Sequence, residues 1–525
     1  MKIFKTKKFK YGFLSVVMSV AVIAVIVIVN TIFQNLAFKF GWYVDMTHEK
    51  MYRASDKIFE YVDKIDKDKN DITVYFFTDK DNLENTVYSG NSISDTSLWG
   101  MKPIHELAVK LEERYDFISV DYIDYTSNPD KLKAIIGEEK YKNSTFTDRH
   151  ILVVNETYQQ NADGTPILGS DGKPVEYIRY KTFSRNSFYL FDHATGTVNA
   201  YRGDYYMTAA IMSLARIDQP TVYFLVGHGE AVGGNSASEQ SDFGSATALS
   251  YLFDECGYTL KKIDLKYDDF DASDKNSIVV LYGPQRDITS AQTVQTVSET
   301  DKLDAFLKRD GNSIMVFLDK KSSGLANLMS LVKKYSGATV SDAKALDSGA
   351  SSVSVDGYSI VGRYQDNKKE SAFAIIDRLV SEKMAYKAVF ADSYPILVPK
   401  DSNKTSAAVL LPDSAGASSY DAIPALLTET KLSGGGSMIL CASTEFANNQ
   451  MLESDVYSNK NLLMSTLYDS NDGNIPLNIK VKNVRDEGLD RTEQEARLWT
   501  LLITVLIPSV FAVAGIIVYV RRRHS

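Results

Sequence analysis

The sequence predicts an α/β protein whose body lies between two membrane-spanning helices. Three observations lead to this fold class. An apolar segment lies near each end of the 525 residues, at residues 13–33 and 498–520. Between them, runs of β-branched and aromatic residues alternate with segments that repeat apolar residues at helical spacing. In the second half of the chain this alternation is typical of a doubly wound parallel sheet.

Both apolar segments are long enough for a spanning helix, which needs about 20 mostly apolar residues. Lysines dominate residues 1–12 before the first segment, and arginines open residues 521–525 after the second. The positive-inside rule therefore predicts a two-pass protein of the cell membrane, with both basic tails cytoplasmic and the body extracytoplasmic. The alternatives are a cleaved signal peptide for the first segment and a buried core helix for the second.

Charge and cysteine content limit the possible partners. The chain has 58 basic and 67 acidic residues, with a net charge of −9, and every acidic residue lies between the two apolar segments. This acidity argues against nucleic acid or anionic lipid as the ligand of the body. Cys256 and Cys441 are the only cysteines. They are too few for a disulfide scaffold, and two buried free thiols are favoured over a pair.

The first block of the body, residues 43–217, mixes strands and helices in an order that resembles a thioredoxin-like domain. The predicted strands and helices, with a hairpin insert at 159–173, are at residues 71–78, 103–115, 117–123, 150–154, 177–190 and 204–217. No cysteine lies in this block. Thiol redox chemistry is therefore excluded there.

The second block, residues 220–484, contains the doubly wound pattern. Its predicted strands are at residues 221–226, 259–265, 277–282, 313–318 and 437–441. Its predicted helices begin near 242 and 301, and a further helix contains residues 462–467. The pattern is less regular over residues 338–430, which we interpret as an insertion. Residues 485–497 form a charged juxtamembrane segment before the second apolar segment.

Polar residues follow two of these strands directly. Gly227, His228, Gly229 and Glu230 come after the strand at 221–226, and Asp319 follows the strand at 313–318. Ligands of doubly wound sheets bind at the carboxyl ends of strands, so these five residues form the candidate binding site. Two interpretations are open: contact with a glycan, peptide or lipid head group, or a tight glycine turn whose side chains bond to the loop backbone.

An enzymatic reading of the same residues is the main competing hypothesis. Amidotransferase-like hydrolases have doubly wound sheets with histidine and glutamate at strand ends, and His228 with Glu230 could act as base and acid or hold a metal. The nucleophile elbow G-x-[SC]-x-G is absent, however, and neither cysteine lies in such a turn. The sequence therefore predicts no catalytic residue, no metal site and no cofactor.

The chain resembles a family of auxiliary components of ABC-type transport systems, named for bacterial gliding motility. The resemblance is carried by DMT at 45–47, the strand at 72–77, VYFLVGHGE at 222–230, LDAFLKRDGNSIMVFLD from Leu303, the segment 436–446 and the closing RRRH. Gly203 and Asp204 stand where the family pattern has Gly-Glu. The resemblance implies a membrane-anchored subunit that works beside a separate ATPase and a multi-span permease.

The absence of an ATP-binding P-loop motif agrees with a separate ATPase subunit. No G-x-x-x-x-G-K-[ST] segment occurs, so the chain does not bind ATP through a P-loop. The predicted function is a non-ATPase accessory subunit of an ABC-type complex, with a body that binds a ligand or partner. The alternative is a cell-envelope protein that binds glycans or acts as an amidotransferase-like hydrolase.

Overall fold

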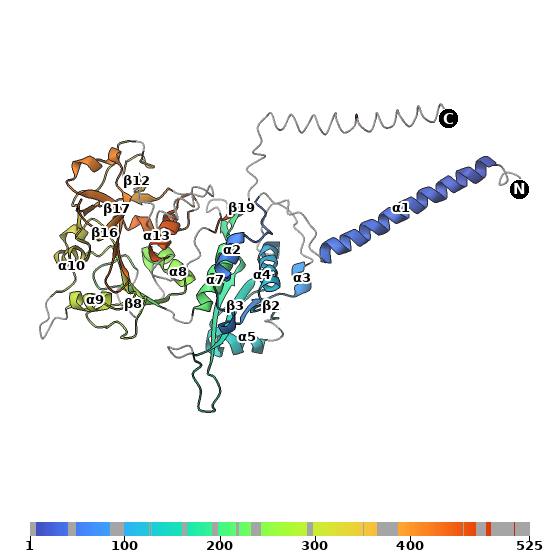
Figure 1. Ribbon diagram of the computed structural model, residues 1–525, viewed down its shortest axis with the longest axis horizontal. Coiled ribbons are helices and arrows are strands. Elements are labelled where there is room, and N and C mark those ends of the chain that lie inside the picture. The colour runs from blue at the N-terminus through green and yellow to red at the C-terminus, as the bar shows by residue number, and fades with distance from the viewer. Residues whose placement is uncertain are drawn as a thin grey trace. The chain divides into compact units, whose positions relative to one another are not determined.

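The computed structural model divides into two units, Ala54–Arg485 and a second unit made of Met1–Arg53 with Asp486–Ser525 (Figure 1). The residues that it describes are 7–39, 49–84, 99–124, 127, 129–159, 165–191, 198–216, 220–232, 243–290, 298–349, 351–364, 387–454, 456–468, 479–484 and 509.

The structure corrects the prediction of two membrane spans. Helix α1 (Lys7–Lys39) contains the first apolar segment, and its side chains are described over residues 16–32. Among the described residues, no helix combines the length and the apolarity that a membrane crossing requires. The two-pass placement, with cytoplasmic tails and an extracytoplasmic body, is therefore wrong for the described residues. The second predicted span, 498–520, lies outside them except for Ser509.

The first block is built on a four-stranded mixed sheet in the order β2-β1-β3-β4. Strand β1 pairs in parallel with β2, whereas β1 with β3 and β3 with β4 are antiparallel. The strands are β1 (Ile72–Phe76), β2 (Ile118–Tyr122), β3 (His150–Tyr158) and β4 (Glu176–Ser184). Beyond the sheet, the β3–β4 hairpin continues as an arm, where the sequence predicts the hairpin insert (Figure 1).

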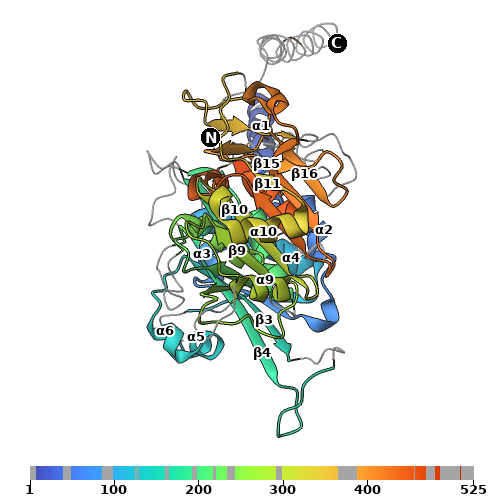
Figure 2. The ribbon, with the colours of Figure 1, turned by 90° about the vertical axis from the view of Figure 1, so that its left-hand side faces the viewer.

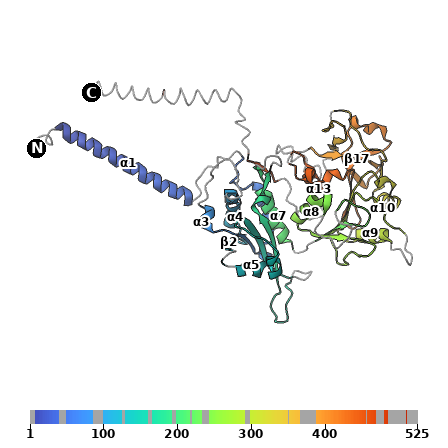
Figure 3. The same cartoon turned by 180° about the vertical axis from the view of Figure 1, so that it is seen from behind.

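The helices of this block include one that is buried along nearly its whole length. Helix α7 contacts α4 and β3 of its own block and α8 of the second block, which explains its mostly apolar sequence (Figure 3). The helices are α2 (Asp56–Val62), α3 (Lys80–Glu84), α4 (Lys102–Arg114), α5 (Pro129–Ile136), α6 (Glu138–Lys142) and α7 (Gly203–Ala215).

A three-stranded sheet joins the end of the body to the first block. Its strands are β5 (Tyr189–Phe191), β6 (Val198–Tyr201) and β19 (Lys482–Asn483), in the order β19-β6-β5. Strand β19 pairs antiparallel with β6, with Lys482 opposite Tyr201. The chain therefore returns to the first block after completing the second.

The second block is centred on five parallel strands in the order β8-β7-β9-β10-β18. These are β7 (Thr221–Leu225), β8 (Thr259–Ile263), β9 (Ile278–Tyr282), β10 (Ser313–Phe317) and β18 (Ser437–Cys441). Every residue of β7, β9, β10 and β18 is buried, as expected for a parallel sheet covered on both faces. This part of the α/β prediction fits the structure.

Helices cover both faces of this sheet. Helices α9 and α10 lie on one face (Figure 2), and α8 and α13 lie on the other (Figure 1). Their bounds, with those of the short α12, are α8 (Thr247–Glu255), α9 (Glu299–Leu307), α10 (Ala326–Ser336), α12 (Asn449–Leu452) and α13 (Asn459–Tyr468).

Within residues 338–430, most of the strands continue the main sheet. Strand β17 pairs antiparallel with β15, β16 and β18. A separate two-stranded sheet joins β12 to β14. The strands are β11 (Thr339–Val340), β12 (Ser359–Val361), β13 (Arg363–Tyr364), β14 (Val389–Ala391), β15 (Ile396–Val398), β16 (Thr405–Leu410) and β17 (Ile423–Lys431).

The turn before β18 provides a stability prediction. A Cβ atom at Gly436 would overlap the backbone carbonyl of Asn312, beside the first residue of β10. Backbone cannot move aside as a flexible side chain can, so we expect Gly436→Ala to lower the free energy of unfolding by about 1–3 kcal/mol. Urea denaturation of the full chain measures this change. Gly324→Ala is the matched control, because no atom lies within 4 Å of a Cβ there. Equal stability of the two variants would contradict the prediction.

Candidate functional site

The predicted site lies where the strand order of the parallel sheet changes direction. Strand β8 lies on one side of β7, and the later strands β9, β10 and β18 follow on the other. The carboxyl ends of β7 and β9 therefore form the switch point at which doubly wound sheets bind ligands. Gly227 and Gly229 adopt φ angles of 104° and 82°, which glycine adopts without strain. The chain thus turns sharply here and directs His228 into the protein.

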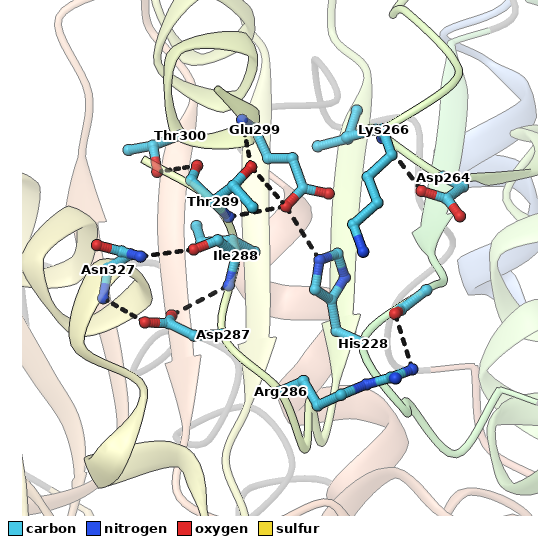
Figure 4. A network of polar contacts seen from close by, with 12 residues as sticks. His228, Asp264, Lys266, Arg286, Asp287, Ile288, Thr289, Glu299, Thr300 and Asn327 are labelled. Atoms are coloured by element: carbon cyan, nitrogen blue, oxygen red, sulfur yellow. Dashed lines mark hydrogen bonds and ion pairs between the residues drawn. The ribbon is translucent and has the colours of Figure 1, made fainter. Parts of the chain in front are cut away.

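His228 is buried between two carboxylates. Its Nδ1 lies 3.2 Å from Oε1 of Glu230, and its Nε2 lies 3.1 Å from Oε2 of Glu299 (Figure 4 shows the Glu299 contact). The backbone N–H of His228 also donates to Oε2 of Glu230, at 2.8 Å. The side chains of all three residues are at most 2% exposed. They form a closed cluster of one imidazole and two carboxylates, which we call the His228 cluster.

The charges of the His228 cluster follow from these contacts. Burial alone would lower the pKa of His228, but the contacts with Glu230 and Glu299 outweigh burial and raise it to about 9. For Glu299 the directions are reversed. Burial alone would raise its pKa, but its bonds to His228 and Thr289 outweigh burial and lower it. At neutral pH the imidazole is therefore protonated. An imidazolium has no lone pair with which to accept a proton, so His228 is not available as a general base in this state.

The His228 cluster is joined to both helices on one face of the sheet. Oε2 of Glu299, in the first turn of α9, accepts bonds from the backbone N–H of Thr289 at 2.8 Å and from its hydroxyl at 3.1 Å. Two residues earlier, Asp287 accepts bonds from the backbone N–H groups of Asn327 at 2.8 Å and Leu328 at 3.1 Å, in the first turn of α10 (Figure 4). The loop after β9 therefore holds the first turns of α9 and α10 in place.

Asp319, at the end of β10, is linked to His228 through Gln285. The side-chain amide of Gln285 donates to Oδ2 of Asp319, and its backbone N–H donates to the carbonyl of His228 at 2.9 Å. Arg286 donates to the same carbonyl at 2.9 Å and, through its guanidinium, to the carbonyl of Gly227 at 3.0 Å. The structure therefore brings all five predicted residues to one edge of the sheet.

The contacts favour the turn interpretation of this edge, because the polar groups bond to one another and to loop backbone. Sequence reasoning missed Glu299 and Gln285. Glu299 is 71 positions from His228 and would be placed only by its strand-helix context, as an acidic residue after the helix cap Ser298. In the part of the chain that the structure describes, no group of three metal-ligating side chains has an arrangement suited to a metal ion.

Both cysteines are buried free thiols, which confirms the favoured interpretation of the sequence. Burial, with a smaller effect from Glu255, raises the pKa of Cys256 to about 12, and burial also raises the pKa of Cys441. A nucleophilic cysteine needs a thiolate. Neither residue offers one at neutral pH.

Comparison with known proteins adds little to this description. No protein-family model and no curated protein matches the chain. A solved structure described as the mmIFT52 N-terminal domain aligns with 15% identity over 48% of this chain and 97% of that chain. Its TM-score of 0.34 is too low to support an argument about fold or function.

Proposed function

We propose that this chain is a non-catalytic accessory subunit of an ABC-type transport complex, which binds a partner or ligand while a separate ATPase hydrolyses ATP. The observation that carries the proposal is the state of His228. The best motif of the resemblance, VYFLVGHGE, contains a histidine, His228, that is held as a cation between Glu230 and Glu299.

A histidine that two carboxylates hold as a cation at a strand end suits a binding subunit better than an enzyme. It joins β7 to the start of α9, and through the loop after β9 to α10. The competing amidotransferase-like hydrolase needs a neutral histidine and a thiolate or hydroxyl nucleophile. The raised pKa values of His228 and Cys256 oppose that reading.

Affinity isolation from the native host tests this proposal. The full chain, tagged and extracted under conditions that preserve membrane complexes, is expected to bring down an ABC ATPase and a multi-span permease in comparable amounts. In the reciprocal isolation, a tag on that ATPase should recover this chain. Recovery of the chain alone, together with an ATPase and permease that associate without it, would overturn the proposal.

A further inference from the structure

Strand β4 ends the four-stranded sheet and leads into the hairpin arm (Figure 2). The backbone N–H of Gln159 donates to the carbonyl of Val175 at 2.8 Å, just before β4 begins. Because bonded and unbonded pairs alternate in an antiparallel ladder, the odd-numbered residues of β4 face β3. The even-numbered residues from 176 to 182 direct their backbone groups away from the sheet. Among the described residues, no backbone bond reaches these groups.

This outer edge lacks the features that usually protect a sheet edge. Short strands, prolines and bulges are common protections. Strand β4 is nine residues long, contains no proline and pairs with β3 without a register shift. A further strand can therefore add to it through backbone bonds.

Exposed apolar side chains gather on the same hairpin. Tyr158, Leu168 and Ile178 are 50%, 61% and 37% exposed. Ile178 is one of the outward-facing residues of β4, and Tyr158 lies at the end of the neighbouring strand, opposite Glu176. Apolar side chains collected on one exposed element are typical of an interaction surface.

The charges along β4 favour one way of pairing it with a second copy of itself. In an antiparallel pair, a two-fold axis at one residue places that residue opposite itself. With the axis anywhere from residue 179 to residue 182, two basic side chains drawn from Arg179, Lys181 and Arg185 lie opposite each other. Like charges directly opposite are destabilising. With the axis at Ile178, no like charges are opposite, and the apolar Ile178 side chains meet at the centre.

Arg179 has the largest effect on this choice, because it takes part in three of the unfavourable registers. Burial lowers its pKa, and its guanidinium lies 5.3 Å from the ring centre of Tyr177. The axis at Ile178 places Arg179 opposite Tyr177 of the second copy, which adds another aromatic ring beside the cation. Lys181 is paired with Asp254 at 3.1 Å, which weakens its repulsion, but an axis there has charged side chains at its centre.

We propose that two copies of this chain pair through β4, antiparallel around a two-fold axis at Ile178. The result is one continuous sheet with four strands from each copy. The outward backbone groups of Glu176, Ile178 and Tyr180 then all have partners. This goes beyond the proposed function, because the contact requires neither an ATPase nor a permease.

Cysteine cross-linking of the purified full chain tests the register. In the proposed pair, the Cα atoms of the two Ile178 residues are about 5.5 Å apart, which a disulfide can span. Ile178→Cys is expected to form a covalent dimer on mild oxidation. Thr182→Cys is the matched control on the same edge, because its two copies are eight residues out of register, about 27 Å apart. Cys256 and Cys441 are buried and present in both variants.

Sedimentation velocity over a series of concentrations tests the contact without a cross-link. We expect the parent chain to dimerise and Ile178→Lys, with two cations at the axis, to raise the dimer dissociation constant at least tenfold. Ile178→Glu should have the same effect, whereas an equal mixture of the two variants should form a heterodimer. Val355→Lys, at a fully exposed position of the second block, should dimerise as the parent does.

These results separate the β4 contact from association through any other surface, which would not respond to residue 178. A parent chain that stays monomeric at every soluble concentration would overturn the proposal. So would a dimer that Ile178→Lys leaves unchanged, or a covalent dimer from Thr182→Cys but not from Ile178→Cys. None of these outcomes depends on co-isolation with an ATPase.

Discussion

Replacing His228 by alanine is expected to lower the free energy of unfolding by about 3–5 kcal/mol. The substitution leaves Glu230 and Glu299 buried without the cation between them, and an uncompensated buried charge has a cost of this size. It also releases the contact that joins the end of β7 to α9. Urea denaturation of the full chain, followed by circular dichroism, measures the change.

The pH dependence of stability follows from the same residue. The folded pKa of His228, about 9, is above the unfolded value of 6.5, so its stabilising contribution is fully present below pH 6.5 and is lost as the pH rises to 9. A shift of this size corresponds to roughly 3 kcal/mol. The parent chain should lose stability over this range, whereas His228→Ala should not show this loss.

A triple variant provides the control for the ionic origin of the effect. Combining His228→Leu with Glu230→Gln and Glu299→Gln removes every charge of the His228 cluster. Neutral replacement of a buried ionic group is often close to neutral for stability, so the triple variant should recover much of the loss. If His228→Ala lowered the free energy of unfolding by less than about 1 kcal/mol, the His228 cluster would not be an important source of stability.

Asp204→Ala is expected to lower the free energy of unfolding by a similar amount, about 3–5 kcal/mol, by removing the carboxylate from a buried ion pair. Asp204 lies at the start of α7, and its Oδ2 accepts bonds from Nζ of Lys482 at 2.7 Å and from the backbone N–H of Ser55 at 3.1 Å. The side chains of the ion pair are 3% and 10% exposed. One carboxylate therefore ties the beginning of the body to its end.

Hydrogen exchange locates this second effect. The variant should lose protection at β19 and at residue 55 before the rest of the body, because Asp204 is the shared contact of both. Glu60→Gln is the control: its ion pair with Lys57 is largely exposed and should contribute less than about 0.5 kcal/mol. Asp204→Ala and Glu60→Gln with equal stability would contradict the role assigned to Asp204.

The sequence predicts best those elements whose pattern is set locally. Strands β7, β9 and β10 are near-continuous apolar runs, and α4 buries Ile104, Leu107 and Leu111 on one face as its spacing predicts. The meeting of His228 and Asp319 at one edge follows from the rule that parallel strands share a carboxyl end.

What the sequence could not predict depends on contacts between distant segments. The short strands of residues 338–430 have too little apolar repetition to reveal that most of them extend the main sheet. Strand β19 pairs with β6, which lies about 280 positions earlier. Likewise, the partners Glu299 of His228 and Lys482 of Asp204 become neighbours only through the tertiary fold. The membrane prediction is wrong for the described residues, because no helix among them combines the length and apolarity of a span.

A measurement of the pKa of His228 tests the central claim, which is that the His228 cluster stabilises the fold and is not a catalytic site. The chain has six histidines, so NMR titration of the histidine-labelled full chain gives few signals, and His228→Ala identifies the one that belongs to His228. His105 is an internal contrast, since burial, with nearby Lys80 and Lys102, lowers its pKa to about 4. We expect a pKa of about 9 for His228. A value at or below 6.5 would leave a neutral imidazole at the strand end and contradict the account.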